Sequence, residues 1–283
     1  VPADSEVQTA LELLEKTNVH LTRINRRMRK NLESAARVQQ ALLPERMPRL
    51  ESVEFAWKFK PCDELAGDIL NVFRINRKTV GLYLLDVTGH GTAAALLAVS
   101  VSRMLSPKAL SSSFVREEDP DAADYKVVPP ARVAQQLNEH FPWDSETGQV
   151  FTLIYGVFDA EDRTFRYVSA GHPGPAIFTA GTDPVIPKSG GLPIGLSTDT
   201  YEEHCIQLNP GDRLHLYSDG VTEAMNKKRE LFGVPRLLDS LRCNCGCSLA
   251  ECQNKLMADL ERFRGSSRFN DDISLLSLEV LAT

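Results

Sequence analysis

The first part of the chain repeats apolar side chains at intervals of seven residues. The repeat comprises two interleaved rows, one of Val7, Leu14, Leu21, Met28, Ala35 and Leu42, the other of Ala10, Thr17, Ile24, Asn31 and Val38. Alternating steps of three and four residues are typical of a coiled coil. We therefore predict one long helix over residues 5–44 that forms a homodimer, with Asn31 as the polar seam residue that sets register. A single helix packed against its own domain is the alternative.

Beyond Pro44 the pattern changes to short apolar or alternating segments separated by turn residues. Strands are predicted at 53–61, 68–76, 79–88, 150–159, 163–170, 174–179, 203–208, 212–218 and 273–281. Helices are predicted at 91–105, 131–141 and 248–263, and residues 107–128 are expected to form a loop. Many strands with helices in two groups predict an α+β fold. We divide the chain into a helical segment, 1–45, that links to an upstream regulatory domain, and a globular domain, 46–283.

Composition and charge narrow the choice of partners. The 283 residues carry a net charge of −6, so there is no basic excess for binding nucleic acid. No apolar stretch is long enough to span a bilayer, and the first residues lack the features of a signal peptide. We therefore expect a cytoplasmic protein with no nucleic acid or membrane partner.

Four of the six cysteines lie close together in the sequence, at Cys243, Cys245, Cys247 and Cys252. Such a cluster could hold a structural metal ion. The spacing lacks the C-x2-C pairs of zinc sites and no histidine lies nearby, so a free-thiol loop ahead of a helix is favoured.

Four short segments place an aspartate where a predicted strand ends in a turn of small residues. They are AGD (66–68), LLDVTGHG (84–91), LYSDG (216–220) and NDDIS (270–274). Carboxylates that converge at one place repel one another unless a cation lies between them. Ligation by carboxylates without Cys or His favours Mg²⁺ or Mn²⁺ over zinc. Each segment alone also fits an ordinary turn, and the repetition is what points to a metal centre.

These and further segments resemble the metal-dependent protein phosphatase family, specifically its bacterial SpoIIE/RsbU branch. The matching segments are ARVQQALLP (36–44), AGD (66–68), LDVTGHGTAAALL (85–97), FTLIYGVFD (151–159), YVSAGHPGP (167–175), GLPIGL (191–196), GDRLHLYSDGVTEAMN (211–226) and DDISLL (271–276). The resemblance implies a central β-sandwich flanked by helices on both faces, a four-layer αββα arrangement, preceded by the long coiled-coil helix.

The resemblance also implies a centre of two Mn²⁺ or Mg²⁺ ions. Its implied ligands are Asp68 for one metal, Asp86 bridging both, the backbone carbonyl of Val87, and Asp219 with Asp271 for the other metal, with Asp272 as the alternative to Asp271. Two such cations would activate a water for in-line attack on phosphorus, so no nucleophile from the protein is required. The implied catalytic residues are Asp86 and Asp219. His90 is a candidate general acid, with a histidine that only packs in the turn as the alternative. Gly89 and Gly91 are candidate phosphate-binding positions, because a glycine-rich turn that leads into a helix N-terminus favours an anion.

Two positions differ from the family pattern, and a third lies near the expected site. Ala66 replaces the first of two glycines that usually precede the first aspartate. Thr88 stands where eukaryotic members carry a histidine, and His90 follows two residues later. His172 is interpreted as a structural turn residue near the site.

Two functions from different classes fit these features. The first is a phosphatase acting on a phosphorylated protein, by resemblance an anti-sigma factor antagonist in a partner-switching pathway. The second is an adaptor that uses the phosphatase fold only to bind a regulatory partner. Because an adaptor has no need of clustered carboxylates and every motif aspartate is present, the enzyme is the favoured interpretation.

Overall fold

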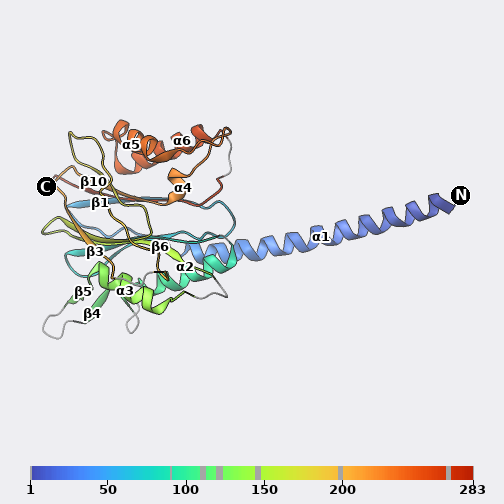
Figure 1. Ribbon diagram of the computed structural model, residues 1–283, viewed down its shortest axis with the longest axis horizontal. Coiled ribbons are helices and arrows are strands. Elements are labelled where there is room, and N and C mark those ends of the chain that lie inside the picture. The colour runs from blue at the N-terminus through green and yellow to red at the C-terminus, as the bar shows by residue number, and fades with distance from the viewer. Residues whose placement is uncertain are drawn as a thin grey trace.

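The computed structural model describes residues 2–89, 91–108, 113–118, 124–143, 148–196, 200–265 and 269–282. Two antiparallel sheets form its centre (Figure 1). The four-stranded sheet has the order β1 (Val53–Lys60), β11 (Ile273–Val280), β10 (Arg213–Tyr217), β8 (Ala176–Phe178). The five-stranded sheet has the order β2 (Ile69–Arg74), β3 (Thr79–Val87), β6 (Phe151–Asp159), β7 (Thr164–Ala170), β9 (Glu203–Gln207).

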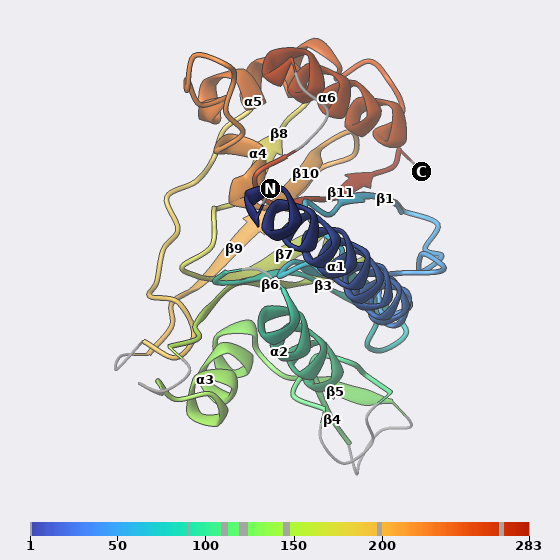
Figure 2. The ribbon, with the colours of Figure 1, turned by 90° about the vertical axis from the view of Figure 1, so that its right-hand side faces the viewer.

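Helices cover the outer face of each sheet (Figure 2). The five-stranded sheet is covered by α2 (Thr92–Met104) and α3 (Pro130–His140), and the four-stranded sheet by α5 (Gly233–Cys243) and α6 (Leu249–Arg264). A short helix, α4 (Asp219–Thr222), follows β10 directly. The four layers confirm the predicted α+β sandwich with helices on both faces.

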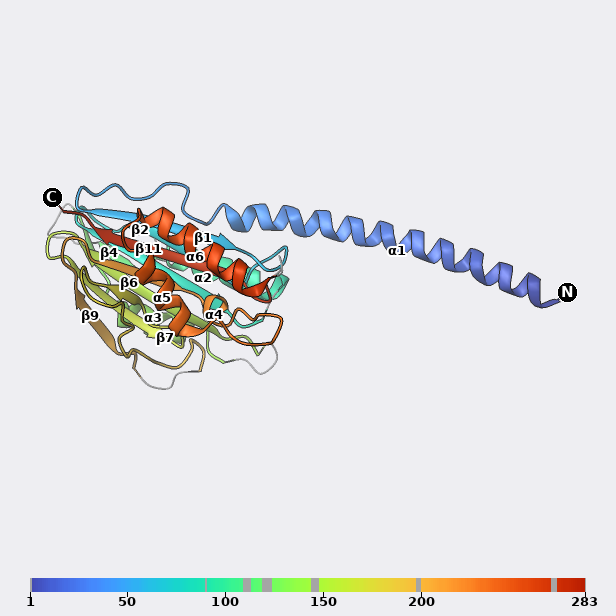
Figure 3. The same cartoon turned by 90° about the horizontal axis from the view of Figure 1, so that it is seen from above.

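The long helix α1 (Pro2–Gln40) extends away from this body (Figures 1 and 3). Where the structure describes α1, its contacts with the domain lie toward its C-terminal end: Arg29 pairs with Glu64 at 3.0 Å, Leu32 and Ala36 are half-buried, and Gln39 is buried. The predicted seam lies on a neighbouring face and stays open to solvent, with Leu21 53% and Val38 68% exposed. Among the described residues, no helix is long and apolar enough to cross a membrane.

Strand β3 explains how the sandwich orients its side chains. Val80, Leu82 and Leu84 join the apolar layer between the two sheets. Tyr83 and Leu85 point the other way, into the layer beneath α2 and α3. Because side chains alternate along a strand, Asp86 continues the inward row after Leu84. The inward row therefore changes from aliphatic to acidic at the end of the strand.

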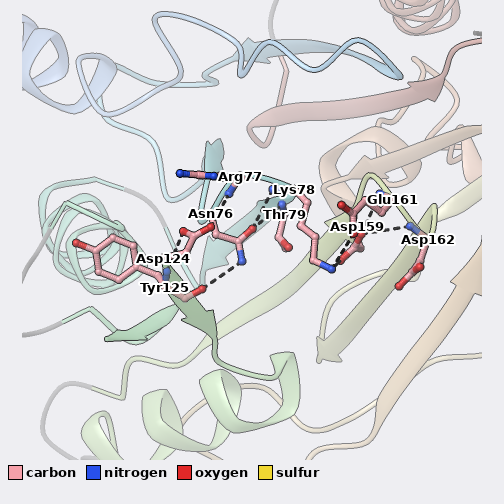
Figure 4. Close-up of polar contacts among 9 residues, drawn as sticks. All are labelled: Asn76, Arg77, Lys78, Thr79, Asp124, Tyr125, Asp159, Glu161 and Asp162. Atoms are coloured by element: carbon pink, nitrogen blue, oxygen red, sulfur yellow. Dashed lines mark hydrogen bonds and ion pairs between the residues drawn. The ribbon is translucent and has the colours of Figure 1, made fainter. Parts of the chain in front are cut away.

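The opposite end of the five-stranded sheet is fixed by a polar network (Figure 4). The Asn76 side chain accepts hydrogen bonds from the backbone N–H groups of Lys78 and Thr79, and its Nδ2 donates to the Tyr125 carbonyl at 3.2 Å. Lys78 Nζ lies 3.7 Å from Asp159 Oδ2 and 3.0 Å from a carboxylate oxygen of Glu161. These contacts join the β2–β3 turn to the β6–β7 turn and to β5 (Tyr125–Val127).

One expectation about local structure was wrong, and one helix was missed. The segment 107–128, expected as loop, contains the short hairpin β4 (Arg116–Glu118) and β5, whose three-residue strands are too short to show a pattern. Helix α5 was not predicted, because Gly233 and Pro235 suggest a break. Pro235 falls in the first turn, where backbone N–H groups have no helical partner, so it does not disturb the helix.

Candidate metal centre

Five aspartates from four segments meet at one end of the sandwich. Asp86 is the penultimate residue of β3, and Asp68 directly precedes β2, the neighbouring strand. Asp219 follows β10, and the pair Asp271 and Asp272 directly precedes β11. The strand pairs β2–β3 and β10–β11 bring these positions to the same edge of the sandwich. All the aspartates that the sequence singled out therefore lie close together.

The Asp68 carboxylate is the most enclosed of the five. It is buried, and Ser274 Oγ donates a hydrogen bond to its Oδ2 at 2.6 Å. Burial, followed by the charges of Asp86 and Asp272, raises the pKa of Asp68 well above its ordinary value. Hydrogen bonds from the hydroxyls of Ser274 and Ser218 oppose this rise in pKa without cancelling it.

Asp86 and Asp219 show the same effect to a lesser degree. Burial, followed by the charges of Asp219, Asp271 and Asp272, raises the pKa of Asp86 to about 7. Burial, followed by the charges of Asp271 and Glu223, raises the pKa of Asp219 to about 6. The cluster therefore retains protons near neutral pH, and a cation that displaces them relieves the repulsion between the carboxylates.

Asp271 and Asp272 have different surroundings. Asp272 is buried, and its carboxylate accepts hydrogen bonds from the N–H groups of Cys62 at 2.8 Å, Gly67 at 2.8 Å and Asp68 at 3.3 Å. Asp271 is exposed, and its Oδ1 accepts from the N–H of Asp272 at 2.8 Å. Asp272 thus holds the loop that carries Asp68, while Asp271 faces the acidic cluster.

Two glycines allow the close approach of backbone segments here. A Cβ added to Gly220 would lie 2.1 Å from the carbonyl oxygen of Asp272. A Cβ added to Gly67 would lie 2.8 Å from the carbonyl oxygen of Val87 and 3.5 Å from Asp86 Oδ1. The Val87 carbonyl and the Asp86 carboxylate therefore face the same narrow space beside Gly67.

The turn after β3 leads into α2. The Thr88 hydroxyl donates to the Val150 carbonyl at 2.9 Å, so this side chain is bonded to the neighbouring chain segment. Gly89 and Gly91 have φ values of 87° and 89°, a conformation that favours glycine, and Gly91 is the N-cap of α2. The expectation for His90 lies outside the described residues.

His172 is buried in the loop after β7. Its Nδ1 lies 2.8 Å from Thr152 Oγ1 and its Nε2 lies 3.1 Å from the Tyr217 carbonyl oxygen. Burial lowers the pKa of His172 to about 3, so the ring is neutral at physiological pH. The ring is bonded on both sides, within the packed end of the sandwich.

One cysteine, Cys62, lies beside the aspartates, whereas the four cysteines clustered in the sequence do not. Among the described residues, Cys62, Asp271 and Asp272 form the one group of potential ligands whose atoms all lie within 4.8 Å of one another. Burial and the neighbouring carboxyls, Asp272 first, raise the pKa of Cys62 to about 12. Cys243, Cys245, Cys247 and Cys252, all among the described residues, are free thiols and form no such group.

Sequence reasoning did not assign a role to several residues around the aspartates. Ser218 follows the inward-facing leucines of β10, and Ser274 precedes the inward-facing leucines of β11. A polar residue at an inward position of an apolar strand was the signal for both. Gln39 is buried in the last turn of α1, where its contact with residue 66 depends on tertiary structure. Cys62 is distant in sequence from the aspartates it contacts.

Comparisons with known proteins place the chain in a family. A family model for stage II sporulation protein E (SpoIIE) matches residues 76–281. The phosphoserine phosphatase RsbU of Bacillus subtilis is 23% identical over 278 residues, which cover 96% of this chain and 77% of RsbU. Protein IcfG of Synechocystis is 25% identical over 266 residues, which cover 88% of this chain and 41% of IcfG. The chain thus spans less than half the length of IcfG.

Solved structures show the same fold. The PP2C domain of SiaA from Pseudomonas aeruginosa superposes with a TM-score of 0.72 at 21% identity, covering 90% of this chain and 98% of that domain.

Proposed function

Because the chain belongs to the SpoIIE family, whose relatives are PP2C-type phosphatases, we propose that it is a metal-dependent serine/threonine protein phosphatase. The observation that carries the proposal is the acidic cluster, in which burial and mutual repulsion raise the pKa values of Asp68, Asp86 and Asp219. A protein that only binds a partner has no use for carboxylates held at this cost. The proposed substrate is phosphoserine or phosphothreonine in another protein.

The donor set fits two Mn²⁺ or Mg²⁺ ions, because it offers carboxylate and carbonyl oxygens in a crowded anionic space. In this proposal Asp86 would help to hold both ions, Asp68 would hold one, and Asp219 with Asp271 would hold the other, with the Val87 carbonyl as a further ligand. Two such ions, when bound, supply Lewis acidity and a water that is deprotonated near neutral pH. Asp86 and Asp219 are the residues on which activity depends most.

We assign the ligand role to Asp271 and a supporting role to Asp272. Both carboxylate oxygens of Asp272 already accept backbone hydrogen bonds from the 62–68 loop. A carboxylate that holds a loop in this way orients the Asp68 ligand, which is the usual role of groups that surround a metal site. Asp271 is exposed and adds its charge to Asp86 and Asp219.

The phosphoryl group is proposed to bind near the start of α2. Gly89 and Gly91 bear no side chain that would block an approaching phosphate, and a Cβ at either position would meet no atom within 4 Å. Backbone N–H groups at a helix N-terminus favour an anion. The role of His90 as general acid stays a prediction.

The relatives suggest the kind of substrate. RsbU is named a phosphoserine phosphatase, and so is RsbP of Bacillus subtilis. By analogy we propose a phosphorylated protein substrate of the anti-sigma factor antagonist type. We also propose that two copies of α1 form a coiled coil, since its apolar seam is exposed along the helix.

The test is Mn²⁺-dependent hydrolysis of a phosphoserine peptide by the wild type and by Asp86→Asn. We expect hydrolysis by the wild type, its loss on chelation, and a fall of at least about 100-fold in the variant, which lacks the bridging carboxylate. Equal activity of the two proteins would defeat the proposed centre. Inactivity of the wild type on several phosphoproteins, with tight binding of one, would favour the adaptor.

A further inference from the structure

His172 connects the two sheets of the sandwich through its two ring nitrogens. Nε2 faces the carbonyl oxygen of Tyr217 on β10, in the four-stranded sheet, and Nδ1 faces the hydroxyl of Thr152 on β6, in the five-stranded sheet. A carbonyl oxygen can only accept, so Nε2 carries the proton and Nδ1 accepts from the Thr152 hydroxyl. This pattern fixes both the tautomer and the direction of each hydrogen bond.

Each end of this bridge lies next to a proposed metal ligand. Thr152 is the direct cross-strand partner of Asp86, and both side chains therefore project from the same face of the sheet. Tyr217 is the last residue of β10, two positions before Asp219. The bridge thus runs from the cross-strand partner of Asp86 to a residue two positions before Asp219.

We propose that His172 is a positioning residue that sets the separation of the Asp86 and Asp219 carboxylates by hydrogen-bonding one sheet to the other. The inference rests on the proposed function in so far as these two aspartates bind metal. A site with two metals tolerates little change in ligand spacing. Apolar contacts between the sheets are non-directional, whereas a hydrogen bond has a preferred length and angle. Directional hydrogen bonds at the edge of the apolar layer therefore restrict changes in that spacing.

The loop around His172 is itself held in place. Ser169 Oγ donates to the His172 carbonyl at 2.5 Å, and the Gly171 N–H donates to the Gly191 carbonyl at 2.8 Å. On the other side of the centre, Ser274 Oγ on β11 donates to Asp68 beside β2, which also joins the two sheets. The site therefore has hydrogen-bonded links between the two sheets both on the Asp68 side and on the Asp86 and Asp219 side.

Positioning explains His172 better than proton transfer does. Both ring nitrogens are engaged, and burial lowers the pKa of the ring to about 3. A neutral ring keeps one donor and one acceptor across the whole physiological range, which a fixed bridge requires.

The experiment compares His172→Phe with a matched control, His215→Phe. His215 is also buried, its pKa is also lowered to about 3, and its Nδ1 lies 2.8 Å from Ser277 Oγ. It lies on β10 and bonds within the four-stranded sheet, away from the aspartates.

Mn²⁺ binding is measured by calorimetry without substrate, and unfolding is measured by denaturant titration without metal. We expect Mn²⁺ affinity to fall about 10-fold in His172→Phe and to stay unchanged in His215→Phe, although both lose stability.

Further variants test the hydrogen-bonded bridge without relying on one substitution that also lowers stability. Thr152→Val removes the donor to Nδ1 and should weaken Mn²⁺ binding, whereas Thr152→Ser, which keeps the hydroxyl, should restore it. If the two residues act through one bridge, the losses in Thr152→Val and His172→Phe do not add in the double variant. Unchanged Mn²⁺ affinity in His172→Phe and Thr152→Val would overturn the inference.

These outcomes are separate from those that test the function. A wild type that binds Mn²⁺ but hydrolyses no phosphopeptide defeats the phosphatase proposal and leaves the His172 comparison intact. A wild type that hydrolyses phosphopeptide while His172→Phe binds Mn²⁺ normally defeats only the positioning role.

Discussion

The side-chain amide of Gln39 hydrogen-bonds both backbone groups of Ala66. Its Nε2 donates to the Ala66 carbonyl at 2.7 Å, and its Oε1 accepts from the Ala66 N–H at 3.1 Å. Gln39 lies in the last turn of α1, and Ala66 lies two residues before Asp68. All four groups are buried, so the exposed helix and the loop of a proposed metal ligand are joined by a pair of bonds shielded from water.

Gln39→Leu should therefore weaken both the fold and the metal centre. The substitution leaves the buried N–H and carbonyl of Ala66 without partners, and each unsatisfied group costs about 1–3 kcal/mol. We expect the free energy of unfolding to fall by about 2–4 kcal/mol and Mn²⁺ affinity to fall with it. Gln40→Leu, at the exposed next residue, is the control and should change neither. Identical Mn²⁺ binding in wild type and Gln39→Leu would show that the contact is structural only.

Asp271→Asn and Asp272→Asn should fail in different ways. Asp271→Asn is expected to keep its fold and lose Mn²⁺ binding at one site, because the carboxylate is exposed and proposed as a ligand. Asp272→Asn places an amide NH₂ against backbone N–H donors and should cost about 2–4 kcal/mol of stability. Denaturant unfolding and calorimetric Mn²⁺ titration separate the two results. The reverse pattern would make Asp272 the ligand.

The stability of the metal-free protein should decrease as pH rises from about 4 to about 7. Asp86 and Asp219 have ordinary pKa values of 3.8 in the unfolded chain, and in the folded protein these rise to about 7 and about 6. Over that interval the folded state holds protons that the unfolded chain has released, so raising the pH favours unfolding. The loss is on the order of a few kcal/mol.

Mn²⁺ should reverse this trend, because it replaces the protons with a cation and its binding releases them. Thermal unfolding in paired samples with chelator and with Mn²⁺, from pH 5 to pH 8, measures both effects. Asp86→Asn should make the metal-free profile less steep, since the amide does not titrate while Asp219 still does. A metal-free profile that rises with pH would contradict the assigned pKa shifts.

The aspartates and the layers were predictable from sequence, whereas the contacts that hold them were not. Asp86 follows an apolar strand and precedes a glycine turn, a local pattern that fixes both its strand and its position at the strand end. The partners of Asp272 lie more than 200 positions away, at Cys62, Gly67 and Asp68, and no periodicity links them. Helix α5 was not predicted, because the sequence alone does not distinguish a proline in the first turn of a helix, where it is tolerated, from a proline that breaks a helix.

Gly220→Ala tests the close packing beneath the cluster. The new Cβ would lie 2.1 Å from the Asp272 carbonyl oxygen, a backbone atom that cannot move without shifting the start of β11. We expect a loss of roughly 3 kcal/mol or more in the free energy of unfolding, together with weaker Mn²⁺ binding. Gly190→Ala is the matched control, because a Cβ there meets no atom within 4 Å. Equal stability of the two variants, measured by denaturant unfolding, would show that the approach at Gly220 is looser than described.

The exposed seam of α1 predicts that the protein is a dimer in solution. Ile24 and Met28 are 42% and 56% exposed, and a helix that carries apolar residues at a strict seven-residue period buries them best against a second such helix. We expect a dimer at micromolar concentration in analytical ultracentrifugation, and a monomer for the double variant Ile24→Glu and Met28→Glu.

Thr22→Glu and Arg26→Glu, off the seam on the same turns of the helix, should leave the dimer intact. Asn31 lies on the seam and is exposed, so two such residues facing each other would favour a parallel pair in register. Asn31→Ile is therefore expected to stabilise the association while allowing other oligomeric states. A wild type that sediments as a monomer at high concentration would contradict the coiled coil and leave the seam without this explanation.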